Sequence, residues 1–321
     1  MEDLEGVPRR RFSEVVKDYE VGVESATSIA EKMVTSGGFT GRHFAEAADI
    51  TAAMWRDPRC FKVLSFPADI ISTGLRGVIK QLTRDDHADM LVTTCGMLDH
   101  DVARSFAPYM KGDFRLDDEE LLKAGYHRLG NVLVPKDSYG PLLEGKLQPL
   151  LEELYSEGRR EIGGSELAWA LGERLLNEDS ILYWAAKKKV PVIIPGLTDG
   201  AVGSQVWLFT QRHRDFRIDV LKDEEIMSDS VFESKKMGAL MLGGGISKHH
   251  TIWWAQFRSG LDYAVYLTTA MEFDGSLSGA LVREAISWGK VKAKAMQTTV
   301  HGDVTVLLPF LVSAALGKLK E

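Results

Sequence analysis

The sequence predicts an α/β protein with a mostly parallel sheet that carries helices on both faces. Short apolar runs typical of strands alternate with longer segments in which apolar residues recur at helical spacing. This alternation is typical of a Rossmann-like sheet, in which helices connect successive parallel strands. With 321 residues, of which 45% are hydrophobic, the chain can bury a substantial core. We therefore expect one large domain with a helical appendage.

The expected elements follow the chain in this alternating order. Residues 1–58 are helical in pattern, most clearly over Phe39–Trp55, and residues 59–321 are expected to form the α/β domain. The expected strands are 61–66, 90–94, 131–135, 190–195, 238–242, 262–267, 290–295 and 304–308. The expected helices are 74–82, 147–157, 165–176, 231–236, 251–258 and 281–288. Residues 109–130, with an acidic run at 117–120, are expected to form a charged excursion.

Composition and charge argue against several classes of protein. The net charge of −7 disfavours a nucleic-acid surface and favours polyamines or a basic protein loop as partners. Two cysteines far apart, Cys60 and Cys95, predict reduced thiols and a cytoplasmic location. The chain lacks an apolar run of about 18 residues, so neither a membrane span nor secretion is expected. The histidines lack zinc-like spacing, and no metal site is expected.

Lys290 is the first candidate for chemistry because of its local pattern. Residues 281–288 have helical spacing, and Gly289 is a typical stop that takes positive φ without strain. Lys290 therefore begins a new element, in which alternating lysines can simply solvate an exposed strand face. Glu284 and Trp288, however, lie one helical turn apart on a face that ends beside Lys290. A carboxylate, an aromatic ring and an amine can then line a common pocket.

Several motifs in the chain are typical of one enzyme family. They are Gly243–His250, Ala264–Tyr266, Thr268–Ala270, Glu272–Ser276 and Ser287–Lys290, preceded by Ile71–Arg76, Leu91–Thr94, Arg128–Pro135 and Leu197–Gly200. On these motifs the chain resembles the deoxyhypusine synthases, especially their archaeal branch. The resemblance covers nearly everything after the N-terminal segment.

The resemblance implies a reaction that suits these residues. In that family NAD takes a hydride from spermidine, 1,3-diaminopropane leaves, and the aminobutyl group forms an imine on an enzyme lysine. The group then passes to a lysine of translation factor 5A and is reduced there by the same cofactor. Lys290 matches the imine-forming lysine and His249 the proton-transfer histidine, a residue type whose pKa suits a general base. The family assembles as a homotetramer of tight dimers, and its N-terminal segment covers a neighbouring subunit's site.

The resemblance also assigns binding residues one by one. The substrate-binding set is Glu284, Trp288, Gly275, Ser276, Asp99 and His100. The cofactor-binding set is Ser72, Thr73, Thr94, Asp199, Gly244, Thr269, Ala270, Asp274, Ser278 and Asp303. Such residues are expected in loops at the carboxyl ends of strands, where open α/β sheets bind ligands. The glycine run 243–245 is not a G-x-G-x-x-G fingerprint and alone predicts only a tight turn.

Departures from the eukaryotic pattern fall on the amine side of the expected pocket. Ser204 and Leu277 stand where that pattern has carboxylates, and His100 stands where it has a glutamate. Ala68 replaces the first serine of a Ser-rich turn. A triamine needs carboxylates because an uncompensated buried charge costs several kcal/mol. Those still available are Asp69, Asp99, Asp101 and Glu284, and the sequence leaves open which of the first three faces the ligand.

Two other functions stay open at this stage. An enzyme with the same NAD and lysine chemistry can pass the aminobutyl group to a small diamine, as a homospermidine synthase does. A catalytically inactive NAD-binding relative is the other alternative. It is disfavoured because loss of activity first relaxes positions such as Lys290, His249 and Glu284, and all three residue types are present. The aromatic patch of Trp253, Trp254 and Phe257 suits a subunit interface or core packing.

Overall fold

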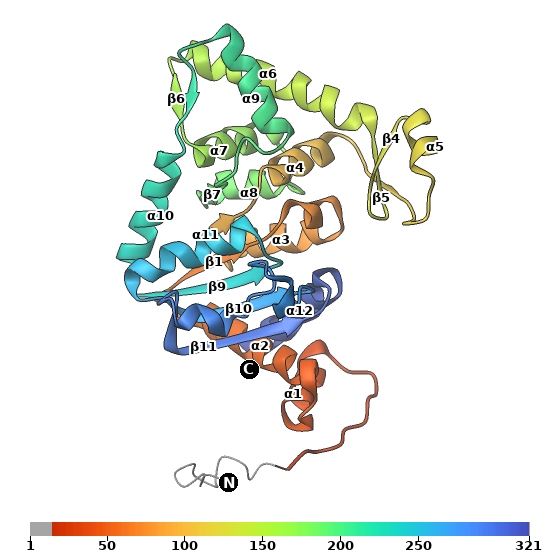
Figure 1. The fold of residues 1–321 in the computed structure, drawn as a ribbon, viewed down its shortest axis with the longest axis vertical. Helices are drawn as coiled ribbons and strands as arrows, with labels where there is room; N and C mark the ends of the chain where they lie inside the picture. The colour runs from red at the N-terminus through yellow and green to blue at the C-terminus, as the bar shows by residue number, and fades with distance from the viewer. Residues whose placement is uncertain (1–14, 321) are drawn as a thin grey trace.

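A six-stranded parallel sheet forms the centre of the molecule (Figure 1). The structure is a computed structural model that describes residues 15–320, so the basic run 9–11 lies outside the described residues. The sheet strands are β1 (Cys60–Ser65), β2 (Met90–Val92), β7 (Val192–Ile193), β9 (Lys236–Leu242), β10 (Leu261–Thr268) and β11 (Val291–His301). The expected α/β fold with a mostly parallel sheet is confirmed.

The order of the strands is β11-β10-β9-β1-β2-β7. Counted along the chain within this sheet, the order reads 6-5-4-1-2-3, which is the doubly wound arrangement that binds dinucleotides. The chain reverses its direction of travel between β1 and β9, which pair in parallel register from Cys60 opposite Lys236 to Ser65 opposite Met241. A crevice at the carboxyl ends of these two strands is the expected place for a ligand.

Helices cover both faces of this sheet. Successive residues of a strand point to opposite faces, and in β1 Leu64 joins one core cluster while Val63 joins the other. On the Leu64 side the sheet packs against α2 (Phe39–Arg56), α3 (Leu75–Arg84) and α12 (Val304–Leu319). On the Val63 side it packs against α10 (Leu221–Glu233) and α11 (Ile246–Ala255). The inner strands are therefore buried on both faces, whereas the edge strand β11 is partly exposed.

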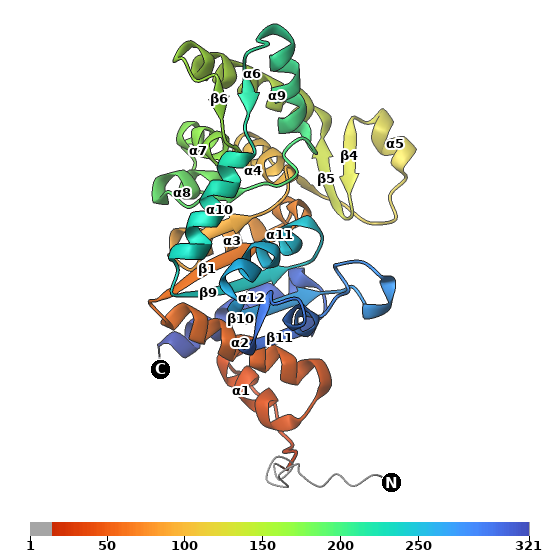
Figure 2. The ribbon, with the colours of Figure 1, turned by 60° about the vertical axis from the view of Figure 1, so that its left-hand side comes forward.

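A group of helices and a separate pair of short strands lie beyond the β7 edge of the sheet. They are α4 (Gly96–Phe106), α6 (Gly140–Ser156), α7 (Gly164–Leu175), α8 (Ile181–Lys188) and α9 (Ala201–Arg212), with the short parallel pair β6 (Glu161–Ile162) and β8 (Arg217–Ile218). The expected charged excursion contains α5 (Asp118–Lys123), β3 (Met110–Lys111) and β4 (Tyr126–Leu129), which stand out from the body (Figures 1 and 2). The expected strand 131–135 is β5 (Val132–Pro135), but it pairs antiparallel with β3 and β4 outside the main sheet.

The strand expected at 304–308 is wrong, because this segment opens helix α12. Its β-branched residues favour a strand locally. The Asp303 side chain instead accepts a hydrogen bond from the Thr305 backbone N–H at 2.6 Å, which caps a helix. Buried positions then recur at helical spacing, at Leu308, Leu311, Val312, Ala314 and Ala315. A short apolar run is compatible with either a strand or a helix, because it is too short to show a periodicity. The helical spacing over Val304–Leu319 identifies this segment as a helix.

Other boundaries also differ from expectation. The helix expected at 231–236 ends at Glu233, and β9 already begins at Lys236. The helix expected at 251–258 begins a full turn earlier, at Ile246, so His249 and His250 lie on α11 and not in a loop. The segment 281–288 contains a short 3-10 helix, Val282–Ile286, and Gly289 takes φ +69° as its stop requires. Helices α4, α8 and α9 were not expected.

The N-terminal segment contributes α1 (Ala26–Ser36) and α2, and α2 confirms the helix expected over Phe39–Trp55. Phe44 and Met54 of α2 belong to the same core cluster as the sheet. A domain boundary at residue 58 stays a prediction. Across the described residues no helix has the length and apolar character to cross a membrane, and Cys60 and Cys95 are buried free thiols.

Candidate active site

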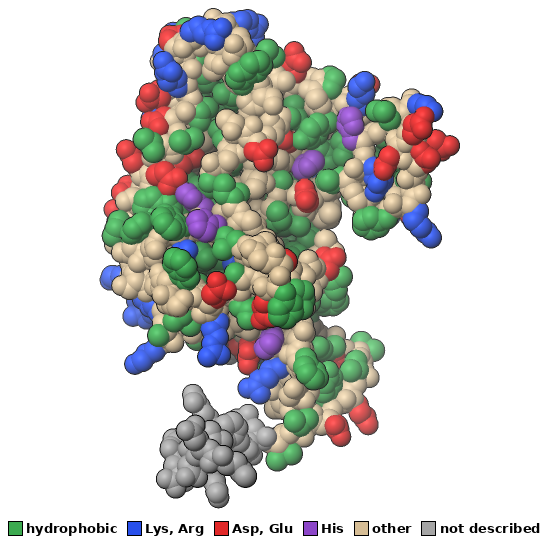
Figure 3. All heavy atoms as spheres, viewed as in Figure 1, with side chains coloured by type: hydrophobic (Ala, Val, Ile, Leu, Met, Phe, Trp, Pro, Cys, Tyr) green, Lys and Arg blue, Asp and Glu red, His purple; other side chains and the backbone are tan. Residues whose placement is uncertain are grey.

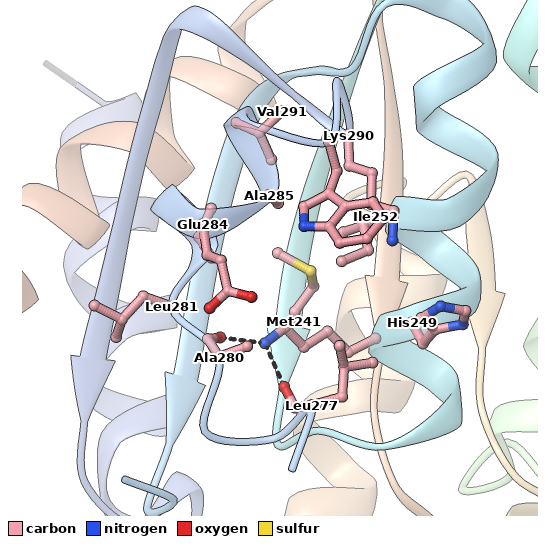
Figure 4. A pocket seen from close by; sticks show the side chains of 13 residues that line it. Met241, His249, Ile252, Leu277, Ala280, Leu281, Glu284, Ala285, Lys290 and Val291 are labelled. Carbon is pink, nitrogen blue, oxygen red and sulfur yellow. Dashed lines mark hydrogen bonds between the residues drawn. The ribbon is translucent and has the colours of Figure 1, made fainter. Parts of the chain in front are cut away.

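A pocket of about 140 Å³ lies between α11 and the segment 277–291, on the Val63 side of the sheet (Figure 4). Its lining includes four of the residues that the sequence singled out: His249, Glu284, Trp288 and Lys290. The remaining lining residues are Met241, Lys248, Ile252, Leu277, Ala280, Leu281, Val282, Ala285 and Val291. A few polar groups thus converge in a mostly apolar pocket, which is the usual composition of a ligand site.

Lys290 is fixed at the base of this pocket by its backbone. Its N–H donates to the Ala285 carbonyl at 3.0 Å, and its carbonyl accepts from the Leu261 N–H at 3.1 Å. Only 7% of the residue is exposed. The amine Nζ lies 5.2 Å from the ring centroid of Trp288 and 5.3 Å from that of Trp253. The lysine amine therefore lies close to two indole rings, and the residue is largely buried.

His249 faces the same pocket from helix α11. Its ring stacks on Trp253, one helical turn further on, with centroids 5.7 Å apart and planes 28° apart. Burial, and then the positive charge of Lys290, lower the pKa of His249. The imidazole is therefore neutral near pH 7 and can accept a proton.

The neighbouring histidine points the other way. His250 Nε2 lies 3.4 Å from a carboxylate oxygen of Glu224 on α10. The second Glu224 oxygen accepts a hydrogen bond from Trp254 Nε1 at 2.6 Å. Helix α11 thus presents His249 to the pocket, with Trp253 stacked beside it, while His250 and Trp254 anchor another face of the helix to α10. Figure 3 shows histidines and hydrophobic side chains gathered over these two helices.

The acidic group of the pocket is Glu284, whose carboxylate points into the cavity from the 3-10 helix Val282–Ile286 (Figure 4). Leu277, one of the departures from the eukaryotic pattern, lines the same cavity. Ser204, another departure, is exposed on α9, where its hydroxyl donates to the Gly200 carbonyl. The pocket therefore carries one carboxylate and several aromatic and apolar walls.

Lys248 is a pocket residue to which the sequence analysis gave no role. It is 1% exposed, and its Nζ donates to the carbonyls of Leu277 at 2.9 Å and Ala280 at 2.6 Å. The same amine lies 3.8 Å from the Tyr266 ring centroid. Burial lowers the pKa of Lys248 to about 8, against the attraction of Glu284. If the helix had been expected to begin at residue 246, the i, i+4, i+7 spacing of Lys248, Ile252 and Ala255 would have predicted that Lys248 lies on the buried face.

The lowered pKa of Lys248 makes the stability of the protein dependent on pH. Between about pH 8 and the ordinary lysine pKa, the unfolded chain binds more protons at this site than the folded chain. The free energy of unfolding therefore rises with pH in this window, by on the order of 3 kcal/mol for the whole shift. We expect urea unfolding at pH 7.5 to 10.5 to show this rise in the wild type relative to Lys248→Met.

The matched control is Lys123→Met, since the Lys123 side chain is 71% exposed in an ordinary helical ion pair. The difference in free energy of unfolding between Lys123→Met and the wild type should not change across the same pH range. If the free energy of unfolding of the wild type minus that of Lys248→Met stayed constant or fell as the pH rises, the lowered pKa of Lys248 would be contradicted.

The residues predicted to bind the cofactor follow the carboxyl ends of the sheet strands. Because all six strands are parallel, these loops meet at one edge of the sheet. Ser72 and Thr73 follow β1, Thr94 follows β2, Asp199 follows β7, Gly244 follows β9, Thr269, Ala270, Asp274 and Ser278 follow β10, and Asp303 follows β11. The structure therefore brings the predicted cofactor set to one edge, although the role of each residue stays a prediction.

Contacts between these loops show how closely they pack. Thr94 Oγ1 accepts from the Ala68 N–H at 3.2 Å, which ties the loop after β2 to the loop after β1. The Ser278 carbonyl accepts from the Tyr266 hydroxyl at 2.7 Å. A Cβ on Gly244 would lie 2.2 Å from Ser278 Oγ, so only glycine fits there. Hydroxyl groups, backbone N–H groups and the Asp199 carboxylate at this edge suit a dinucleotide, so the residues present fit NAD.

Asp274 and Ser276 form a local turn in the loop after β10. The Asp274 carboxylate accepts from the backbone N–H and the hydroxyl of Ser276, and these bonds lower its pKa. Gly275 between them takes φ +69°. Gly275 and Ser276 precede Leu277, which lines the pocket, so the turn lies beside the cavity.

Asp99 and His100 do not line the pocket of Lys290. Asp99 accepts from the backbone N–H groups of Ala201 and Val202 and from the Tyr139 hydroxyl at 2.8 to 2.9 Å, which caps the start of α9. His100 Nδ1 lies 2.9 Å from the Tyr109 hydroxyl, and burial lowers its pKa. Both side chains are committed to buried contacts of one protomer, and their predicted role in substrate binding stays a prediction.

Comparison with known proteins identifies the family. The family model described as deoxyhypusine synthase matches residues 28–315. The chain belongs to the deoxyhypusine synthase family. A "probable deoxyhypusine synthase" of Picrophilus torridus is 52% identical over 95% of this chain and 98% of that relative. The corresponding proteins of Thermoplasma volcanium and Ignicoccus hospitalis are 49% and 47% identical and also cover almost the full length of both chains.

The family assignment confirms the resemblance, including its archaeal character. A solved structure from Entamoeba histolytica that is named for the same synthase matches with a TM-score of 0.63. It is 20% identical and covers 94% of this chain and 97% of that one, so it supports the fold.

Proposed function

We propose that this protein is a deoxyhypusine synthase that transfers the aminobutyl group of spermidine to one lysine of translation factor 5A, through an imine on Lys290. The observation that carries the proposal is the convergence of a buried lysine amine, a neutral imidazole and a carboxylate in one pocket. These are the groups that imine formation, proton transfer and amine binding require. Membership of the deoxyhypusine synthase family supports the same reaction.

Each pocket residue has a definite part in this proposal. Glu284 binds an ammonium group of the substrate, and His249 accepts and returns the proton when amines are exchanged. Lys290 attacks the carbon that has lost its hydride, and the two indole rings keep water from the imine that forms. The acceptor lysine then displaces Lys290 by the same exchange in reverse.

NAD, when bound, supplies the oxidation of spermidine and the final reduction of the product. The residues that would hold it are those at the carboxyl edge of the sheet, from Thr94 and Gly244 to Ser278 and Asp303. Their position at the crossover between β1 and β9 supports this part of the proposal.

We also propose the assembly and the location that the family assignment suggests. Trp288 is 65% and Phe273 86% exposed beside the pocket, and large exposed aromatic groups at a site suit coverage by a second subunit. A homotetramer of dimers accounts for this exposure. A cytoplasmic location follows from the proposed protein substrate, which acts in translation.

The test of this proposal is label transfer from spermidine. The purified protein is incubated with NAD and spermidine labelled in its butyl part, with and without translation factor 5A of the same organism. Label on the factor, accompanied by 1,3-diaminopropane, is the expected result. Label in homospermidine when a diamine is supplied would favour the small-acceptor alternative, and unchanged spermidine would contradict both enzymatic readings.

A further inference from the structure

The clearest residue beside the pocket without a family-assigned role is Trp253, which lies near both proposed catalytic groups. On helix α11 its ring stacks with that of His249, with centroids 5.7 Å apart, and Lys290 Nζ lies 5.3 Å from its ring centroid. Its ring is held in this place because the adjacent Trp254 is hydrogen-bonded to Glu224 on α10. The helix therefore has little freedom to rotate Trp253 away from the pocket.

We infer that Trp253 is a catalytic residue that forms, with Trp288, an aromatic clamp for the cationic nitrogen of Lys290. The face of an indole ring attracts a cation that lies within about 6 Å of its centroid. Both rings meet this distance, at 5.3 and 5.2 Å. The inference rests on the proposed function in that the cation of interest is the protonated imine of Lys290.

The composition of the pocket explains why aromatic rings, and not a carboxylate, stabilise the positive charge on Lys290. In the lining, Leu277 stands where the eukaryotic pattern has a carboxylate, and Glu284 is the one acidic residue. A carboxylate in contact with the lysine nitrogen would favour its ammonium form and weaken it as a nucleophile. A ring face stabilises positive charge more weakly than a carboxylate does and neither donates nor accepts a proton, so it holds the protonated imine while favouring the ammonium form of the free amine less.

The covalent step balances without any further reactant. NAD⁺, when bound, would supply the two-electron oxidation by accepting a hydride from the carbon beside the secondary nitrogen of spermidine, which would leave a C=N⁺ bond. The neutral Lys290 amine adds to this carbon, a proton moves from Nζ to the departing nitrogen by way of His249, and 1,3-diaminopropane leaves. The positive charge ends on Lys290 Nζ as a protonated imine between the two rings.

The clamp can be tested without cofactor or spermidine, because butanal condenses directly with a lysine amine and releases water. Imine at Lys290 is trapped with borohydride and quantified by peptide mass spectrometry across pH 6 to 10. Trp253→Leu, which removes the ring, is expected to lower the trapped fraction by about tenfold, and Trp253→Phe by less. As the pH rises, the yield of trapped imine at Lys290 should begin to fall at a lower pH in Trp253→Leu than in the wild type, because the protonated imine loses the stabilisation that the ring gives.

Two controls separate the clamp from general damage. Trp207→Leu removes a tryptophan that is 64% exposed on α9, and it should leave the yield at Lys290 unchanged. Lys123, largely exposed, serves as an internal reference for butanal reactivity. If Trp253→Leu fails to fold, Trp253→Phe and Trp288→Leu carry the same comparison.

The outcomes distinguish this inference from the proposed function. Wild-type yield and pH dependence in Trp253→Leu would overturn the clamp, even if labelled spermidine is turned over. A change only in oligomeric mass by light scattering, with the yield unchanged, would also overturn it and make Trp253 an interface residue. A reduced yield in Trp253→Leu supports the clamp even if spermidine proves not to be the substrate.

Discussion

Lys290→Ala is expected to lower aminobutyl transfer by at least about a thousandfold, the scale on which loss of a covalent nucleophile acts. No other lysine replaces it easily, because Lys248 is bound to two carbonyl oxygens. The measurement is label transfer from spermidine to translation factor 5A, together with borohydride trapping of label on the enzyme. The variant should trap no label, while NAD binding measured by calorimetry should persist because Lys290 is not among the residues proposed to hold the cofactor.

The matched control is Lys294→Ala, which removes an exposed lysine from β11, the strand that begins directly after Lys290. It should retain wild-type transfer, and Lys290→Arg should be as inactive as Lys290→Ala because a guanidinium does not lose its proton at working pH. Transfer by Lys290→Ala within tenfold of the wild type would rule out the lysine imine. Trapped label on a different lysine would move the site to that residue.

Asp101→Asn is expected to lower the free energy of unfolding by about 3–5 kcal/mol, because it leaves a buried arginine without its counter-charge. Asp101 is fully buried, and the Arg76 side chain is 8% exposed. The Asp101 carboxylate accepts from Arg76 Nε at 2.6 Å, from the Ser180 hydroxyl at 2.6 Å and from the Leu182 N–H at 2.9 Å. It therefore joins α3, α4 and the start of α8 at one point.

Urea unfolding at pH 7 measures this loss. The control is Asp113→Asn, whose partner Arg115 is 89% exposed and whose loss should cost less than about 1 kcal/mol. The double variant Arg76→Met with Asp101→Leu should recover part of the stability, since apolar residues can replace a buried ion pair. A loss below 1 kcal/mol for Asp101→Asn would mean that the pair does not hold these helices together.

The structure separates the carboxylates that the sequence left equivalent. Asp101 is committed to Arg76 and the start of α8, and Asp99 to the start of α9. Asp69 is exposed in the loop after β1. Of the three, Asp69 thus remains accessible to a ligand in a single protomer, and no sequence pattern distinguishes it, because helix caps and ligand carboxylates are the same residue types.

Local sequence determined much of the framework. Six expected strands occur in the central sheet, because their apolar runs are short and bounded by turns. They are those at 61–66, 90–94, 190–195, 238–242, 262–267 and 290–295. Gly289 ends its turn with positive φ, as its lack of a side chain predicts, and β11 begins at Val291, directly after Lys290. The motifs around Lys290 also led to the family, since they are numerous and widely spaced.

Tertiary structure decided what local spacing cannot encode. The run from Val304 became helix α12 because its buried face meets the sheet and Asp303 caps its start. Lys248 lines the pocket and Trp253 lies beside Lys290 because α11 begins at Ile246. Their partners lie up to 37 residues away in the chain, at Lys290. Propensity and periodicity depend on near neighbours, whereas burial and the surroundings of a charge depend on segments that only folding brings together.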